Sequence, residues 1–127
     1  SGQQSGSQMR DFRSLKVWAK AHQLALEIYR ATANFPRDEQ FGLTSQLRRA
    51  AASIGANIAE GCGRDSDGDL RRFLEIAMGS ASELEYHLVL AVDLGLLPPD
   101  VHRQLDGSAV EVKRMLATFI RRFRSDH

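Results

Sequence analysis

Residues 46–61 form an alanine-rich stretch, QLRRAAASIGANIAEG, with isoleucines at positions 54 and 58. Alanine has the highest helix propensity of all residues, and the two isoleucines are separated by one helical turn. The stretch therefore predicts a helix that begins near Leu43 and ends at Glu60 or Cys62. Apolar residues occupy more than one face of this helix, so we expect it to be covered on more than one side.

A period of 3.6 residues per turn divides this helix into three faces. The aliphatic face, which is expected in the core, consists of Leu43, Leu47, Ala50, Ile54, Ile58 and Gly61. The polar face consists of Gln46, Arg49, Ser53, Asn57 and Glu60. The third face consists almost entirely of small residues, namely Thr44, Ala52, Gly55, Ala56 and Ala59.

The small-residue face has two interpretations. Alanine is common on a solvated helix surface because of its propensity, so the face is explained without any partner. Small residues also let two helices approach closely, and an exposed glycine within a helix has no propensity benefit. Gly55 therefore favours a contact with another subunit, for which Ala52, Gly55, Ala56 and Ala59 are the predicted residues.

Residues 15–33 predict the first helix, with Ser14 as its N-cap. Its apolar residues form two neighbouring stripes: Val17, Ala21, Leu24 and Ile28, and beside them Trp18, His22, Ala25 and Tyr29. This apolar arc is wider than one core-facing stripe requires. Either the helix lies deep in a bundle or its second stripe meets another subunit, so Trp18 and Tyr29 are also predicted interface residues.

Two further helices are predicted at residues 70–94 and 99–124, after a loop in which Ser66, Asp67 or Asp69 caps the third helix. The core stripe of the third helix is Leu70, Leu74, Ala77, Ala81, Leu84, Leu88 and Ala91. The core stripe of the fourth is Val101, Leu105, Val112, Leu116, Phe119 and Phe123. Four long helices with short links predict an all-α fold, an antiparallel up-down-up-down four-helix bundle.

The polar face of the second helix predicts a buried polar network with the third helix. We expect Arg49 to pair with Glu83, because a buried arginine has to be ion-paired and hydrogen-bonded. Ser53, Asn57 and Ser80 are expected to satisfy the remaining polar groups. Such a network more often sets the register of helices than it performs chemistry, and a ligand site is the alternative interpretation.

The composition of the chain limits the kinds of protein to which it can belong. The chain has 127 residues, a formal net charge of +1 and a single cysteine, so neither a global attraction to nucleic acid nor an intrachain disulfide is expected. No apolar run is long enough to span a membrane, and a cytoplasmic location is expected. Residues 1–9 are expected to be a flexible tail or a vector-derived remnant, ahead of one four-helix domain at 10–127.

No catalytic, cofactor or metal site is predicted. The histidines at 22, 87, 102 and 127 form no His-x-x-x-His or Glu-x-x-His pair, although a di-iron bundle requires Glu-x-x-His motifs on two helices. The sequence contains no glycine-rich phosphate loop and no nucleophile elbow. A protein without enzymatic activity is therefore expected.

The fourth helix carries a candidate nucleic-acid surface. Arg103, Arg114 and Arg121 share one face, with Lys113 and Arg124 on its shoulder. This strip predicts contacts with the phosphates of RNA or single-stranded DNA, and an oligomer would repeat the strip and add its contacts. A solvated helix face with favourable dipole placement is the alternative, and the net charge of +1 weighs against binding.

Several motifs together resemble a known family. They are Phe12-x-x-Leu15-x-x-Trp18, Phe35-Pro36-x-x-Glu39-x-x-Gly42-Leu43, the run from Gln46 to Gly61, and Phe73-Leu74-x-Ile76-Ala77-x-Gly79-Ser80-x-x-Glu83-Leu84. From Met9 to about Leu97 the chain resembles the bacterial four-helix bundle proteins called 23S rRNA intervening-sequence proteins.

The resemblance implies a fold, an assembly and partners, but no activity, because the role of the family is largely unassigned. The related accessory proteins of diversity-generating retroelements are barrel-shaped homopentamers that bind a reverse transcriptase and nucleic acid. A ring-like homopentamer is therefore the implied assembly, with nucleic acid or a protein such as a reverse transcriptase as a further partner. A protein-interaction scaffold that binds no nucleic acid is the alternative function.

Overall fold

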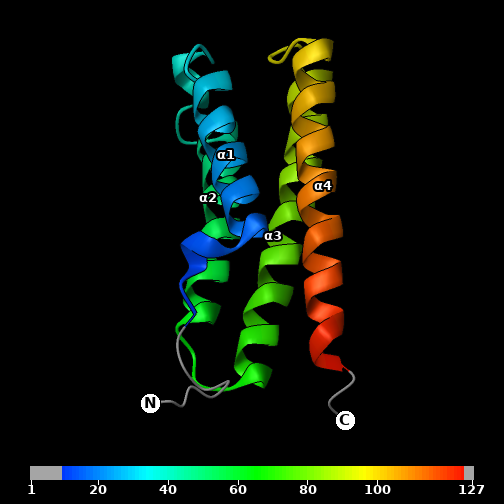
Figure 1. Cartoon of the computed structure of the whole chain (residues 1–127). Coiled ribbons are helices and arrows are strands. Elements are labelled where there is room, and N and C mark those ends of the chain that lie inside the picture. The colour runs from blue at the N-terminus through cyan, green and yellow to red at the C-terminus, as the bar shows by residue number, and fades with distance from the viewer. Residues whose placement is uncertain (1–9, 125–127) are drawn as a thin grey trace.

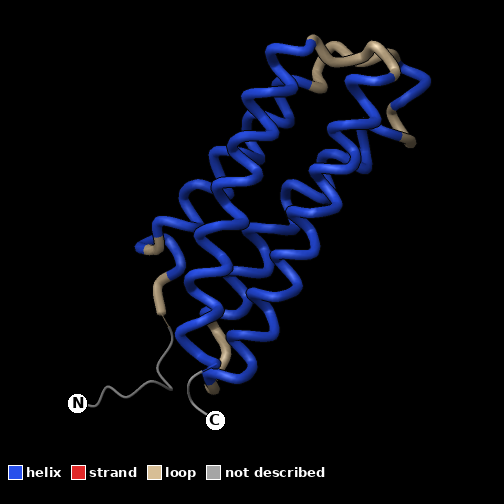
Figure 2. Tube along the Cα trace, turned by 90° about the vertical axis from the view of Figure 1, so that its right-hand side faces the viewer, coloured by secondary structure: helices blue, strands red, loops and turns tan. Residues whose placement is uncertain are grey.

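The computed structural model describes residues 10–124, except for the side chain of Arg124, and within that range it contains helices and loops but no strand (Figure 2). The elements are η1 (Phe12–Ser14), α1 (Lys16–Ala31), η2 (Arg37–Glu39), α2 (Leu43–Cys62), α3 (Asp67–Asp93) and α4 (Pro99–Arg124). The prediction of an all-α fold with four long helices is confirmed. The segment at 1–9 for which we expected a tail lies outside the described residues.

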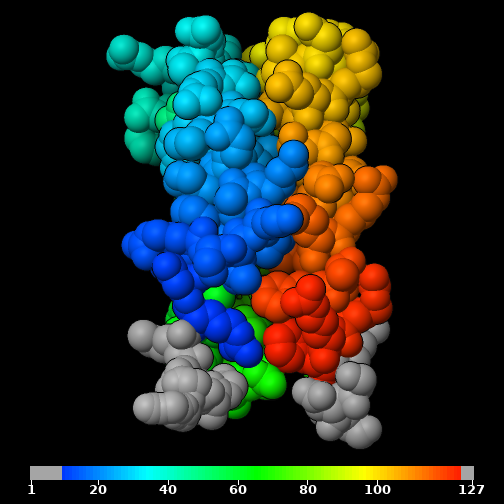
Figure 3. Space-filling model, viewed as in Figure 1, coloured from blue at the N-terminus to red at the C-terminus, as the bar shows by residue number. Residues whose placement is uncertain are grey.

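The four long helices lie side by side, and the chain reverses its direction at each connection (Figure 1). Helix α2 packs against α1 and α3, and α4 packs against α1 and α3. The space-filling view shows the face on which side chains of α1 meet those of α4 (Figure 3). Of the four long helices α1 is the shortest, with 16 residues against 27 in α3, and residues 10–11 and η1 lie below its first turn.

The core contains the apolar stripes that the sequence predicts for the first three helices. All the residues expected in the core stripes of α1, α2 and α3 are buried. Burial of one leucine or isoleucine side chain stabilises the fold by about 1.5–3 kcal/mol relative to exposure, so these stripes supply the main driving force for the bundle. None of the helices in the described range is both long and apolar enough to cross a membrane.

Two of the expected aromatic core residues of α4 are not fully buried. Phe119 and Phe123 are half-buried and contact each other at 5.6 Å between ring centroids, whereas Ile120 is 5% exposed. Ala109, which the predicted stripe omitted, is completely buried. The long α4 extends below α1, so its last turns have one neighbour fewer and the large rings remain at the edge of the core.

Both ends of α3 follow capping rules. The hydroxyl of Ser66 accepts a hydrogen bond from the backbone N–H of Asp69 at 3.1 Å, which confirms it as the cap of α3. Gly95 ends α3 with a positive φ of 76°, the conformation that glycine adopts most easily. The predicted cap Ser14 is wrong: Leu15 is the N-cap of α1, and the Ser14 hydroxyl donates to the carbonyl of Asp11.

Gly61 allows α2 and α3 to approach closely beside the turn that joins them. A Cβ atom at this position would lie 2.9 Å from Cδ1 of Leu70 and 3.0 Å from Cβ of Phe73. Side-chain carbons do not normally come this close, and the Cβ of Phe73 moves only with its backbone. Gly61 is itself buried, so any added methyl group would have to be accommodated inside the core.

We predict that Gly61→Ala lowers the free energy of unfolding by about 1–3 kcal/mol, the usual effect of overpacking a core. The measurement is urea denaturation followed by circular dichroism. The matched control is Gly79→Ala in α3, where an added Cβ has no neighbour within 4 Å. Because alanine has the better helix propensity, this control is expected to raise the stability by up to about 1 kcal/mol. Similar effects of the two substitutions would contradict the close approach at Gly61.

Candidate functional site

An apolar groove of about 370 Å³ runs along the outer surface between α1 and α2. It is lined by all six residues predicted to contact another subunit: Trp18, Tyr29, Ala52, Gly55, Ala56 and Ala59. The other lining residues, among them Ala25 and Leu26, are mostly apolar as well. The second stripe of α1 and the small-residue face of α2, which the sequence presents separately, therefore form one surface.

The groove exists because one helix presents large rings and the other has almost no side chains opposite them. Trp18 packs on Gly55, where an added Cβ would lie 3.4 Å from the indole Nε1. The indole is also stacked on His22 at 4.8 Å between centroids and contacts Phe12 edge-on at 5.0 Å. Ala56 is exposed, so the floor of the groove is shallow and apolar.

Arg48, a residue that the sequence analysis did not single out, contacts Tyr29, one of the residues that line the groove. Its Nε donates to Oγ1 of Thr32 at 2.8 Å, and its Nη2 donates to the carbonyl of Tyr29 at 3.2 Å. Its guanidinium also lies 4.7 Å from the centre of the Tyr29 ring. These contacts satisfy one backbone carbonyl and one side-chain hydroxyl at the carboxyl end of α1, and they link that end to α2.

A short polar seam joins α2 to α3. The hydroxyl groups of Ser53 and Ser80 are 2.8 Å apart and form a hydrogen bond. Nδ2 of Asn57 donates to the carbonyl of Ser53 at 2.8 Å and to its hydroxyl at 3.0 Å. Ser53, Asn57 and Ser80 therefore form neutral hydrogen bonds at a partly buried position, instead of satisfying the polar groups of Arg49 and Glu83 as predicted.

The charged part of the predicted network is wrong. Arg49 and Glu83 are both exposed, and no ion pair or hydrogen bond joins them among the described residues. Water solvates an exposed guanidinium well, so no buried partner is required. On the polar face of α2, Arg49 is exposed whereas Ser53 is partly buried. The arginine therefore lies outside the seam between α2 and α3.

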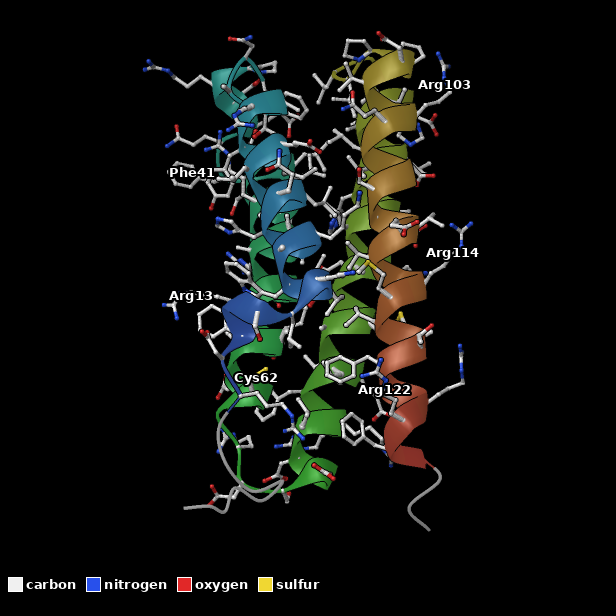
Figure 4. All side chains as sticks on the ribbon, viewed as in Figure 1. Arg13, Phe41, Cys62, Arg103, Arg114 and Arg122 are labelled. Atoms are coloured by element: carbon white, nitrogen blue, oxygen red, sulfur yellow. The ribbon has the colours of Figure 1, made fainter. Side chains whose placement is uncertain are left out.

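Of the five residues in the predicted basic strip of α4, three are exposed in the described part of the structure. Arg103, Arg114 and Arg121 are exposed, and Figure 4 shows Arg103 and Arg114 pointing away from the bundle. Lys113 is only half-buried and its Nζ lies 2.7 Å from Oε1 of Glu85 on α3, so its charge is neutralised there. The side chain of Arg124 lies outside the described part of the structure.

The groups with chemical reactivity are scattered. Within residues 10–124 no three histidine, cysteine, aspartate or glutamate side chains are grouped so that they could hold a metal ion. Cys62 is 1% exposed, and burial raises the pKa of its thiol; nearby Arg10 lowers that pKa and Asp11 raises it. Because the raised pKa keeps the thiol protonated at neutral pH, Cys62 is a packing residue rather than a nucleophile.

Comparison with known proteins identifies two similarities. A family model described as 23S rRNA-intervening sequence protein matches residues 13–118. The crystal structure of a protein of unknown function from the S23 ribosomal protein family of Bacteroides thetaiotaomicron is similar with a TM-score of 0.74. The two sequences are 28% identical, and the similarity covers 82% of this chain and 97% of the other. No curated protein matches the sequence.

Arg48 and Arg49 are adjacent on α2 but differ in their contacts, so replacing each by alanine tests what the contacts of Arg48 contribute to stability. We predict that Arg48→Ala lowers the free energy of unfolding by about 1–3 kcal/mol, because it leaves the nearly buried Thr32 hydroxyl and the Tyr29 carbonyl without their charged donor. Arg49→Ala is expected to change the stability by less than about 0.5 kcal/mol. Urea denaturation of dilute protein measures both values, and the reverse order would restore Arg49 as the structural arginine.

Proposed function

The chain belongs to the 23S rRNA-intervening sequence protein family, and on this premise we propose that it is a self-associating helical bundle that acts by binding rather than by catalysis. The family description names no reaction, and the similar solved protein is itself described as having unknown function. The proposal therefore depends on the surfaces of the chain.

The observation that carries the proposal is the apolar groove between α1 and α2. An apolar groove of about 370 Å³ on a small protein is a typical site for an apolar partner. Covering it removes apolar surface from water at about 25 cal/mol per Å², and the alanines on its floor let a partner approach closely. Among the described residues that line the groove, only His22 and Tyr29 carry titratable side chains, and no carboxylate, lysine or cysteine accompanies them as a catalytic partner.

The proposed partner is a second copy of the chain, and the proposed assembly is a ring-like homopentamer. The number five follows from the family resemblance alone, whereas self-association follows from the groove. Helix α4 contributes no residue to the lining, so closing an assembly through this groove, whatever its subunit number, does not require α4 to be covered. The exposed arginines of α4 would then be repeated once per subunit.

A second candidate function is binding of RNA or single-stranded DNA by α4. The supporting observation is that Arg103, Arg114 and Arg121 are exposed and fall on one line of the helix. At 1.5 Å per residue they are about 16 Å and 10 Å apart along the axis, a spacing that fits separate phosphates of an extended strand. A protein adaptor, for example one that binds a reverse transcriptase, is the alternative use of the same assembly.

Self-association is tested by placing a charge in the groove. We predict that Ala56→Arg weakens association of the subunits by at least about 100-fold, which is about 2.8 kcal/mol, because the contact would bury an unpaired guanidinium. Sedimentation velocity over a concentration series measures the effect. Since Ala56 is exposed in the isolated chain, the variant is expected to unfold at the same urea concentration as the unmodified protein at high dilution.

The matched control is Ser82→Arg, which introduces the same charge at an exposed position of α3 away from the groove. It is expected to leave association unchanged. A protein that remains monomeric at high micromolar concentration would contradict the proposed self-association. Equal weakening by the two substitutions would show that net charge, rather than the groove, controls association.

Nucleic-acid binding is tested with a labelled single-stranded RNA by fluorescence anisotropy. Three phosphate contacts per subunit predict that the logarithm of the binding constant falls with the logarithm of salt concentration with a slope of about −2. We predict that replacing Arg103, Arg114 and Arg121 together by serine removes binding at about 50 mM salt, where the electrostatic contribution is largest.

The control replaces the exposed Lys20, Arg30 and Arg37 by serine, which changes the net charge by the same amount on another side of the bundle. This variant is expected to bind RNA as the unmodified protein does. If the unmodified protein fails to bind at about 50 mM salt, the second candidate function is wrong.

A further inference from the structure

Phe41 is the most exposed of the large hydrophobic residues that the structure describes. Its side chain is 90% exposed, compared with 62% for Tyr86 and 58% for Leu94. Figure 4 shows it on the outer side of the α1–α2 pair, pointing away from the bundle. An aromatic ring in this position contributes nothing to the core, and its apolar surface is unfavourably hydrated.

The turn that carries Phe41 is held by a continuous set of hydrogen bonds. In η2 and the residue after it, the N–H groups of Glu39 and Gln40 donate to the carbonyls of Pro36 and Arg37 at 2.9 and 3.0 Å. The N–H of Gly42 donates to the carbonyl of Glu39 at 3.0 Å. Oε1 of Glu39 also accepts from the N–H of Leu43, the first residue of α2, at 3.2 Å. The backbone that carries Phe41 is therefore held by these bonds, which reduces the backbone entropy lost on binding.

Phe41 does not fill the groove of its own chain. It is absent from the groove lining, and the nearest alanine in that lining on the exposed face, Ala52, lies nine residues into α2, about 14 Å along the axis from Leu43. One chain thus presents a fixed apolar knob and a separate apolar groove lined by Trp18, Tyr29 and small residues. Aromatic rings that fill pockets are the usual anchors of protein interfaces.

We infer that Phe41 of one subunit inserts into the α1–α2 groove of a second copy of the chain. This inference rests on the proposed self-association and names the element that brings it about. Because the knob and the groove are different patches of the surface, the contact is head-to-tail, and it closes into a ring when the rotation per subunit allows.

The charges beside the two patches are complementary, which favours a copy of this chain as the occupant. Residues 37–39 of the turn (Arg-Asp-Glu) have a formal net charge of −1, and Asp38 is exposed with no ion-pair partner among the described residues. Arg49, three residues before Ala52, is likewise exposed without a partner in the described part of the chain. Seating the knob in the groove brings the Phe41 turn of one subunit to the surface of α2 in the other, where Asp38 and Arg49 have opposite charge.

The test separates the knob from the groove. Phe41→Ser removes the knob and leaves the groove intact, whereas Ala56→Arg blocks the groove and leaves the knob intact. Each variant alone is expected to sediment as a monomer at concentrations where the unmodified protein associates, with a loss of affinity of about 30-fold or more for Phe41→Ser. An equimolar mixture is expected to form a one-to-one heterodimer, because the first variant supplies a groove and the second a knob.

Tyr86→Ser is the matched control, since it removes another exposed aromatic ring, from α3, and is expected to leave association unchanged. Circular dichroism of each variant verifies that the bundle is folded. Association that survives Phe41→Ser but is lost with Ala56→Arg would overturn the role of Phe41 and leave the proposed self-association in place. If both variants are monomeric and do not associate when mixed, the role of Phe41 is again overturned and the proposed self-association remains. If the unmodified protein is itself monomeric, both the role of Phe41 and the proposed self-association are wrong.

Discussion

The structure depends on the close approach of α2 to the helices on its two sides. At Gly61 the absence of a side chain lets Leu70 and Phe73 of α3 pack directly on the backbone of α2. At Gly55 the indole of Trp18 covers the opposite side of the same helix. Since α1 and α3 are both positioned against α2, and α4 fills the remaining side against them, the small residues of α2 set the dimensions of the whole bundle.

The same composition that permits close packing also leaves a surface uncovered. Ala52 and Ala56 are too small to fill the space beside the rings of α1, and the result is an apolar groove instead of a smooth helix surface. Between α2 and α3, by contrast, the contact includes a neutral, partly buried hydrogen-bonded seam at Ser53 and Ser80. A neutral seam sets the register of the helices without the desolvation of charged groups. Charge is thereby kept at the surface, where Arg49 and, on α4, Arg103, Arg114 and Arg121 are exposed.

Much of the fold was predictable because it depends on local periodicity. Residues buried on one face recur at steps of three and four, so the core stripes of α1, α2 and α3 could be identified from the sequence, and so could the cap at Ser66. The six residues assigned to a subunit contact were also recognisable as unusual helix faces. What could not be predicted was which side chains beyond each stripe come together, because that depends on how the helices are rotated against each other.

Arg48 and Arg49 illustrate this division between sequence and tertiary structure. Both arginines belong to the same alanine-rich helix, and the helical period assigned Arg49, rather than Arg48, to the face on which a buried network was expected. The rotation of α2 against α1 places Arg48 on the carboxyl end of α1, with a 2.8 Å hydrogen bond to Thr32, and leaves Arg49 exposed.

The sequence alone determined four amphipathic helices and their buried faces, because hydrophobic periodicity is a property of each segment. Only the tertiary structure decided the groove, the neutral seam and the exposed position of Phe41, because each depends on the relative placement of residues distant in the chain.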